Sequence, residues 1–219
     1  MNLEDREEAA VRIAPAMLVI FASVFAFASL VASPIAVPAS PVVAAKGDHC
    51  TDWTSKTEPP PTIQVYRVSE GFVESVDFKD YVIRVVSREW NVDQRALRRA
   101  GAVAVKQYAW YHVLHYRGGK FDGQCFDVKD STADQLYAAK PLAQIPRRVK
   151  RAVNFTWSWR LYRDGKFIMT GYRRGADVGC AENGGYRLYV RSARKCAKHG
   201  WNAARILSVY YTANLEGNT

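Results

Sequence analysis

One carboxylate, Glu89, lies at the end of an apolar stripe. Tyr81, Val85 and Glu89 are spaced at i, i+4 and i+8, which puts them on one face of a helix. An ionised carboxylate at the end of a buried face is costly unless it is paired. Burial without a partner would raise the pKa of Glu89 and suit it to act as a general acid. The alternative is a structural role, in which Glu89 turns outward and pairs with Arg88 or Arg95.

The histidines are a weaker signal for chemistry. His112 and His115 lie three residues apart on one face of a predicted helix, and Cys125 follows them. This set could bind zinc, but the spacing matches no standard zinc site closely, so we predict no metal. The chain has no local cysteine-protease signature and no glycine loop of the kind that binds phosphate. We therefore expect no cofactor.

The four cysteines are better explained by disulfide bonds, which are typical of exported proteins. Cys180 and Cys196 flank a loop that contains two glycines, and we predict that they pair with each other. Cys50 would then bond to Cys125 and tie an N-terminal segment to the rest of the protein.

Two helices are expected to position Glu89. Apolar periodicity predicts one helix over about residues 78–89 and a second over about residues 94–116, with Asp93 as the N-cap of the second. Further on, alternating aromatic residues over residues 156–162 and 166–170 flank Asp164-Gly165, a dipeptide typical of tight hairpins. We therefore expect an α+β single domain, in which the two packed helices lie against a mixed or antiparallel sheet with a C-terminal hairpin.

The N-terminal region differs in composition from the rest of the chain. Residues 13–32 are almost wholly apolar, enough to span a bilayer as a helix or to act as a long export signal. We predict a signal peptide or N-terminal membrane anchor over residues 1–45, with Val43-Ala44-Ala45 as the first choice of cleavage site. A Pro-rich linker over residues 46–62 and a domain over residues 63–219 would follow. The domain is then expected outside the cytoplasm, secreted or anchored to the membrane.

The chain is basic, with 31 Lys and Arg residues against 21 Asp and Glu, a formal net charge of +10. Residues 46–219 alone carry 29 basic and 17 acidic residues, which raises the net charge to +12. A basic surface suggests a polyanionic partner, and simple solubility is the alternative explanation. The export segment and the lack of a nucleic-acid motif argue against nucleic acid. An extracytoplasmic anion, such as a wall polymer, fits better.

Short motifs along the two predicted helices carry a family resemblance. They are Asp80-Tyr81-Val82, Val85-Val86, Glu89, Ala96-Leu97, Ala102-Val103-Ala104 and Tyr108-Ala109, followed by residues 126–137. This set resembles the core signature of the stage II sporulation protein D family, also called the amidase-enhancer domain family. In the enzymes of that family, the glutamate at the position of Glu89 is the catalytic acid of a peptidoglycan lytic transglycosylase. The resemblance further implies substrate-binding roles for Gln135, Tyr137, Lys106 and Tyr108.

The implied function is cleavage of peptidoglycan glycan strands at the cell wall. Glu89 would protonate the glycosidic oxygen and then, as a base, deprotonate the muramoyl O6 hydroxyl that attacks C1. This scheme needs one carboxylate, whereas ordinary glycoside hydrolases need two. The alternative is a non-catalytic peptidoglycan-binding module or an enhancer that acts on a cell-wall amidase.

The sequence also departs from the family pattern. Gly101, Lys106 and Gln107 stand where Gln, Arg and Thr are usual. A glycine-rich loop of the family is not recognisable, and residues 189–201 occupy its place. The missing loop favours the binding module, whereas the retained Glu89 favours catalysis.

Overall fold

The computed structural model describes residues 49–137, 139–175, 179–181 and 185–217, which belong to one compact unit, Val43–Thr219. The predicted signal peptide or membrane anchor and its cleavage site lie outside these residues. Within the described residues, no helix is long and apolar enough to cross a membrane. The elements, in chain order, are β1 (Thr62–Arg67), β2 (Phe72–Asp77), α1 (Phe78–Glu89), α2 (Arg95–Leu114), β3 (Lys120–Phe121), β4 (Gln124–Cys125), β5 (Val128–Lys129), the 3-10 helix η1 (Leu142–Gln144), α3 (Arg147–Phe155), β6 (Arg160–Arg163), β7 (Lys166–Phe167), β8 (Gly171–Arg173), β9 (Arg187–Tyr189), α4 (Val190–Lys198), α5 (Ala203–Tyr211) and β10 (Asn214–Glu216).

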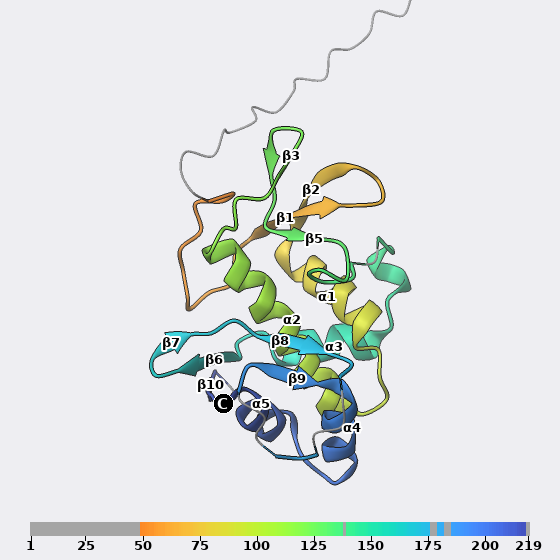
Figure 1. Ribbon diagram of the computed structural model, residues 1–219. Coiled ribbons are helices and arrows are strands. Elements are labelled where there is room, and N and C mark those ends of the chain that lie inside the picture. Colours follow the sequence, from red (N-terminus) through yellow and green to blue (C-terminus); the bar gives the residue numbers. More distant parts are fainter. Residues whose placement is uncertain (1–48, 138, 176–178, 182–184, 218–219) are drawn as a thin grey trace, which may run out of the picture. The chain divides into compact units, whose positions relative to one another are not determined.

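The predicted α+β domain with two packed helices is confirmed. Helices α1 and α2 lie side by side and carry the other elements around them (Figure 1). The Asp77 side chain caps α1 by accepting a hydrogen bond from the backbone N–H of Asp80 at 2.9 Å. The prediction of Asp93 as the N-cap of α2 is wrong. Gln94 is the N-cap and makes no side-chain cap hydrogen bond, while the Asp93 side chain is 91% exposed.

Trp90 joins the two helices tightly. It follows α1, is fully buried, and its ring packs against the backbone of α2 at Gly101. A Cβ atom added at Gly101 would lie 2.1 Å from the Trp90 ring, far inside van der Waals contact. The glycine that departs from the family pattern is therefore required by the tryptophan that follows Glu89.

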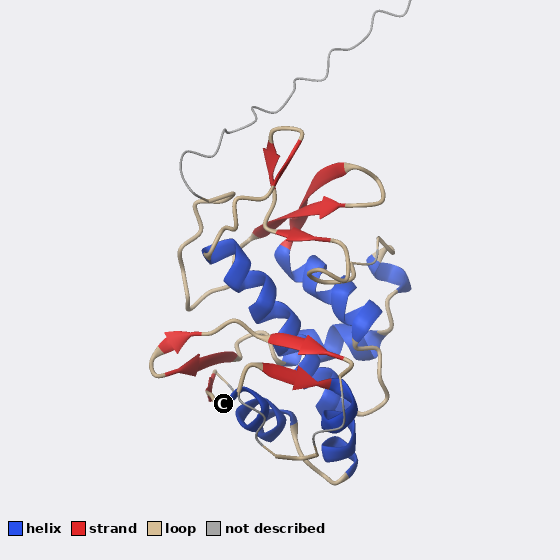
Figure 2. Cartoon of the chain, in the orientation of Figure 1, coloured by secondary structure: helices blue, strands red, loops and turns tan. Residues whose placement is uncertain are grey.

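The strands form four small sheets among the described residues, where the sequence predicted a single one (Figure 2). The first is mixed, with order β2-β1-β5, and the second is antiparallel, with order β10-β6-β7. The remaining two are the antiparallel pair β3-β4 and the parallel pair β8-β9. Figure 1 shows β1, β2 and β5 at one end of the helix pair and β6 to β10 toward the other.

The predicted hairpin is confirmed, but it is shorter than expected. Asp164 and Gly165 both have positive φ, 50° and 68°, as its two-residue turn requires. The first strand begins at Arg160 instead of residue 156, because α3 continues to Phe155 and a turn follows it. The hydroxyl of Thr156 donates to the carbonyl of Ala152 at 3.0 Å, which keeps this residue attached to the helix end.

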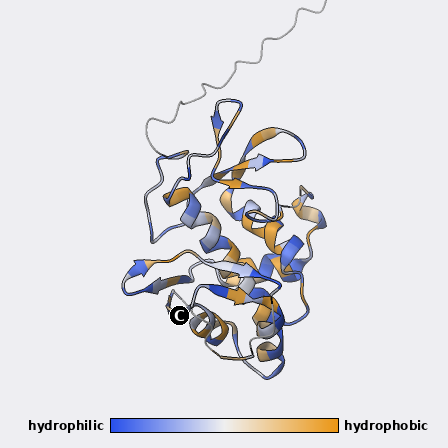
Figure 3. Cartoon of the chain, viewed as in Figure 1, coloured by the Kyte–Doolittle hydropathy of each residue, from blue (hydrophilic) through white to orange (hydrophobic). Residues whose placement is uncertain are grey.

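The hydrophobic core is centred on α2 and the elements packed on it. Figure 3 shows hydrophobic residues along α1 and α5, which both contact α2. Helix α5 contributes fully buried side chains to this core, namely Ile206, Leu207, Tyr210 and Tyr211. A continuous core of this kind holds the end of α1, and with it Glu89, in a fixed place.

Both predicted disulfide pairings are present in the structure. Cys50 bonds to Cys125 and Cys180 to Cys196, each with a Cα–Cα distance of 5.5 Å. The first bond helps to hold the described part of the predicted linker along the domain. The indole N–H of Trp110 donates to the carbonyl of Ser55 at 2.9 Å, which fixes the same segment further along.

Candidate active site

Glu89 is the last residue of α1 and is partly buried. Its Oε1 atom accepts a hydrogen bond from the backbone N–H of Leu136 at 2.6 Å, and its Oε2 atom accepts one from the hydroxyl of Tyr172. Burial raises the pKa of Glu89, and these two hydrogen bonds oppose that rise. The carboxylate is thus held by two neutral donors, and not by the alternative ion pair with Arg88 or Arg95.

A buried network fixes the donor Tyr172. The Tyr81 hydroxyl donates to Gln135 Oε1 at 2.9 Å, and Gln135 Nε2 donates to the Tyr172 hydroxyl and to the carbonyl of Val105, both at 3.2 Å. Trp90 meets the Tyr172 ring edge-on, at 5.2 Å between centroids. The network therefore links α1, α2 and β8 around the carboxylate and leaves Tyr172 little freedom to turn away.

Gln135 and Tyr137, predicted as substrate-binding residues, lie beside this network. The Gln135 side chain is fully buried, and Tyr137 is 8% exposed with its ring stacked on Tyr81 at 5.5 Å. The Arg67 guanidinium lies over the Tyr137 ring, 5.0 Å from the ring centroid. In this geometry both residues position the groups around Glu89, and their roles in binding substrate stay predictions.

Lys106 and Tyr108 lie in different environments. Lys106 is 1% exposed, and its Nζ atom donates to the carbonyls of Thr156, Trp157 and Trp159, just beyond α3. Burial, with the nearby charge of Arg160, lowers the pKa of Lys106 to about 7. The three carbonyls match the three N–H donors of the ammonium form. These contacts give Lys106 a structural role, and its predicted role in binding substrate stays a prediction. Tyr108, in contrast, faces an open cleft.

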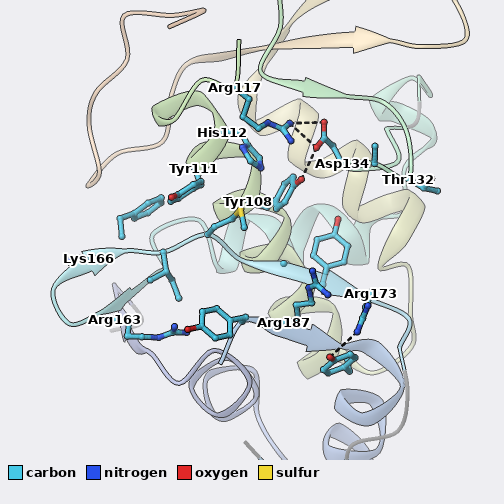
Figure 4. Close-up of a pocket in the computed structure, with 18 residues that line it drawn as sticks. Tyr108, Tyr111, His112, Arg117, Thr132, Asp134, Arg163, Lys166, Arg173 and Arg187 are labelled. Carbon is cyan, nitrogen blue, oxygen red and sulfur yellow. Dashed lines mark hydrogen bonds and ion pairs between the residues drawn. The ribbon is translucent and has the colours of Figure 1, made fainter. Parts of the chain in front are cut away.

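This cleft has a volume of about 1210 Å³ and lies beside Tyr172 (Figure 4). Its aromatic lining residues are Tyr108, Tyr111, Phe167, Tyr172, Tyr186 and Tyr189. Its cationic lining residues are Arg117, Arg163, Lys166, Arg173 and Arg187. The Tyr172 ring lines the cleft while its hydroxyl contacts Glu89, so the residue connects the cleft to the carboxylate.

Two sides of the cleft differ in how their charges are paired. Figure 4 shows Arg117 and Asp134 on one side, and Arg163, Arg173 and Arg187 on the other. Arg117 is paired with Asp134 at 2.9 Å, and the Tyr108 hydroxyl donates to the same carboxylate at 2.8 Å. The charge of Arg117 is thus neutralised by Asp134, and the side with Arg163, Arg173 and Arg187 carries most of the positive charge that lines the cleft.

Sequence reasoning missed the residues that complete the site. Neither Tyr172 nor the cations on β6 to β9 are among the site residues predicted from the sequence. The available signal is Gly171-Tyr172, which resembles a strand end in the family pattern. That resemblance could have pointed to a role for the tyrosine. Residues 189–201, which replace the glycine-rich loop, end β9 and form α4, and Tyr189 lines the cleft.

The histidines do not assemble a metal site. Within the described part of the chain, no group of three His, Cys, Asp or Glu residues lies close enough together to hold a metal ion. Cys125 is in a disulfide bond. Burial lowers the pKa of His112 to about 4, so this cleft-lining imidazole is neutral near pH 7.

Comparison with known proteins gives one family match. The SpoIID family model, described as Stage II sporulation protein, matches residues 66–161. No curated protein matches the chain. The matched stretch includes α1, α2 and α3 and ends within β6, before Tyr172.

Proposed function

Through residues 66–161 the chain belongs to the stage II sporulation protein family, and we propose that it is an extracytoplasmic peptidoglycan lytic transglycosylase. The observation that carries the proposal is the environment of Glu89. Its pKa is raised by burial, its two oxygens are held by Leu136 and Tyr172, and a large cleft lies on the other side of Tyr172. A carboxyl group with a raised pKa is suited to donate a proton near neutral pH.

The proposed reaction uses Glu89 twice. Protonated Glu89 donates its proton to the glycosidic oxygen as the bond to C1 of the muramoyl residue breaks. The resulting carboxylate then accepts the proton of the O6 hydroxyl as O6 bonds to C1, which returns Glu89 to its starting state. The hydrogen bonds from Tyr172 and Leu136 stabilise the carboxylate between these two steps.

The lining of the cleft fits an anionic glycan. Aromatic rings such as Tyr186, which is 72% exposed, present flat apolar faces on which sugar rings can stack. Arg163, Arg173 and Arg187 would face the free carboxylates of the peptide stems. Substrate would therefore be held by the cleft, and the bond that is cleaved would lie next to Tyr172, whose hydroxyl contacts Glu89.

The two disulfide bonds support a location outside the cytoplasm. Disulfide bonds persist in oxidising compartments and are rare in the cytosol. We propose that the domain is secreted or anchored at the cell wall, with peptidoglycan as its partner.

A second candidate function is peptidoglycan binding without cleavage, alone or as an enhancer of a wall amidase. Two observations favour it. Both oxygens of Glu89 already accept a hydrogen bond, and residues 189–201, in which the family's glycine-rich loop is not recognisable, contain the end of β9 and helix α4. Such a module would use the cleft but not the carboxyl group.

The test is digestion of purified peptidoglycan, with products identified by mass spectrometry. The transglycosylase should release muropeptides that end in 1,6-anhydro-muramic acid, because O6 and not water attacks C1. Products with a reducing end would contradict the proposal and indicate a hydrolase with a second carboxylate. Binding in a pull-down assay with no released product would instead support the non-catalytic module.

A further inference from the structure

A cavity of about 220 Å³ between α2 and α3 is lined by arginines from both helices. Helix α2 contributes Arg95, Arg98 and Arg99, and helix α3 contributes Arg148 and Arg151, while Ala152 completes the lining. Five guanidinium groups around so small a space repel one another unless an anion lies between them. The cavity is separate from the cleft beside Tyr172, since the two share no lining residue.

Acidic side chains do little to balance these charges. Among the described residues, one carboxylate, that of Asp93, lies within ion-pair distance of any of these arginines. Its Oδ1 atom lies 4.0 Å from Arg148 Nη1. The Asp93 side chain is 91% exposed, so solvent screens this pair. Arg148 also donates through Nε to the neutral Asn91 side chain at 3.0 Å. The lining therefore keeps a large excess of positive charge.

Arg98 gives an independent indication of an anion-binding site. It is 7% exposed, and its Nη1 atom donates to the carbonyl of Val92. Its Nε–H is buried and has no hydrogen-bond partner among the described residues. A buried, unpaired donor of a charged group is costly, and an anion in the cavity that Arg98 lines would satisfy it.

The start of α2 adds to the positive potential. Three of the five arginines lie in its first two turns, and the first turn holds no acidic residue. The N-cap Gln94 makes no side-chain cap hydrogen bond. The positive end of the helix dipole therefore lies at the end of α2 that carries these arginines.

We propose that this cavity binds a phosphoryl group, either a phosphate monoester or a phosphodiester. Guanidinium groups pair with phosphate oxygens through two parallel hydrogen bonds. A tetrahedral phosphoryl group presents oxygens in several directions and can engage arginines of α2 and α3 together. A planar carboxylate has its two oxygens in one plane and suits a single guanidinium. The arrangement of donors on two helices therefore favours phosphate over carboxylate.

The test is isothermal titration calorimetry on the full-length chain in non-ionic detergent, at constant ionic strength. The probes are inorganic phosphate and the phosphodiester glycerophosphoglycerol, with acetate as the carboxylate control. The test variant is Arg95→Gln/Arg151→Gln, which removes two exposed cavity arginines and leaves the buried Arg98 in place. The matched control is Arg88→Gln/Arg147→Gln, which removes the same charge from exposed positions outside the cavity.

The expected result is saturable binding of at least one phosphate probe, weakened at least tenfold in Arg95→Gln/Arg151→Gln and changed less than about twofold in the control. Tighter binding of the diester would point to a polymer or lipid headgroup as the source, and tighter binding of inorganic phosphate to a soluble phosphate. Absence of saturable binding by both phosphate probes would overturn the proposal. So would equal binding of acetate, or equal weakening in both double variants. None of these readouts depends on glycan cleavage.

Discussion

The stretch that matches the family model and the stretch that follows it contribute different parts of the candidate active site. Residues 66–161 supply Glu89, the helix pair that holds it and the Leu136 N–H. The following residues supply Tyr172, which is the other hydrogen-bond donor to Glu89, and most cations of the cleft. The acid therefore lies inside the stretch that matches the family model, and most of the charged surface that would bind its substrate lies after that stretch. Changes at Glu89 should therefore affect chemistry, and changes at the cations after the matched stretch should affect binding, while Tyr172 couples the two regions through its contact with Glu89.

The largest expected effect is on chemistry, in Glu89→Gln. Gln is nearly isosteric with Glu: its amide oxygen can accept from the Leu136 N–H, and its amide N–H can donate to the Tyr172 hydroxyl, but it cannot donate the catalytic proton. Anhydromuropeptide release should fall by about 10²–10⁴-fold, while glycan binding and thermal unfolding stay close to wild type. Glu58→Gln, an exposed glutamate elsewhere, is the charge-matched control and should keep full activity. Full activity in Glu89→Gln would remove this residue from the mechanism.

The next effect concerns the region after the family match, which Cys180–Cys196 crosslinks. Replacing both cysteines with Ala opens a bond that spans 16 residues, which should cost about 3 kcal/mol of unfolding free energy in the chain-entropy model. Because α4 and β9 are held by this bond, glycan binding should weaken as well. Denaturant unfolding and a glycan pull-down assay provide the measurements.

The Cys50–Cys125 pair provides the comparison for that variant. It spans 75 residues, so its removal should cost more stability, about 4 kcal/mol. It lies outside the lining of the cleft, so glycan binding by the folded fraction should be unchanged. Equal loss of glycan binding in both variants would contradict the division between the two regions.

A smaller effect is expected from Gly101→Ala, inside the matched stretch. The added methyl group would collide with the Trp90 ring, and overpacking of this kind typically costs about 1–3 kcal/mol. In a Trp90→Leu background, the same substitution should become neutral or stabilising, because Ala favours a helix by up to about 1 kcal/mol over Gly. Urea unfolding of the four proteins in this double-mutant cycle measures the coupling. Additive costs would show that the ring and the glycine are not coupled.

The smallest expected effect couples the two regions through Tyr172→Phe. The Tyr172 hydroxyl stabilises the carboxylate, so its removal should raise the pKa of Glu89 further. The limb of the pH–rate profile on which activity falls with rising pH should then move to higher pH. With Leu136 still donating to Glu89, the rate should fall about tenfold, at the low end of the worth of a hydrogen bond to a charged group. Tyr186→Phe, in the same cleft, should leave that limb in place.

The helix pair and the position of Glu89 at the end of α1 could be predicted because their signals are local. The Tyr81–Val85–Glu89 stripe fixes a helix face within three turns, and both disulfide pairings followed from the placement of four cysteines. The donor Tyr172 could not be found this way, because it lies 83 residues from Glu89 and meets it only in the folded chain. The burial of Lys106 could not be predicted either. Its motif position implies substrate binding, which stays a prediction, while its depth in the core follows from how α2 packs against the end of α3.

The Cys50–Cys125 bond also has a mechanical consequence. A force that pulls on the residues before Cys50 would be transmitted through this disulfide bond to Cys125 in β4. The intervening residues, which include α1 and Glu89, form a loop closed by the bond and would carry little of that load. If the N-terminal segment tethers the domain, the acid-bearing helix would be shielded from tension on the tether.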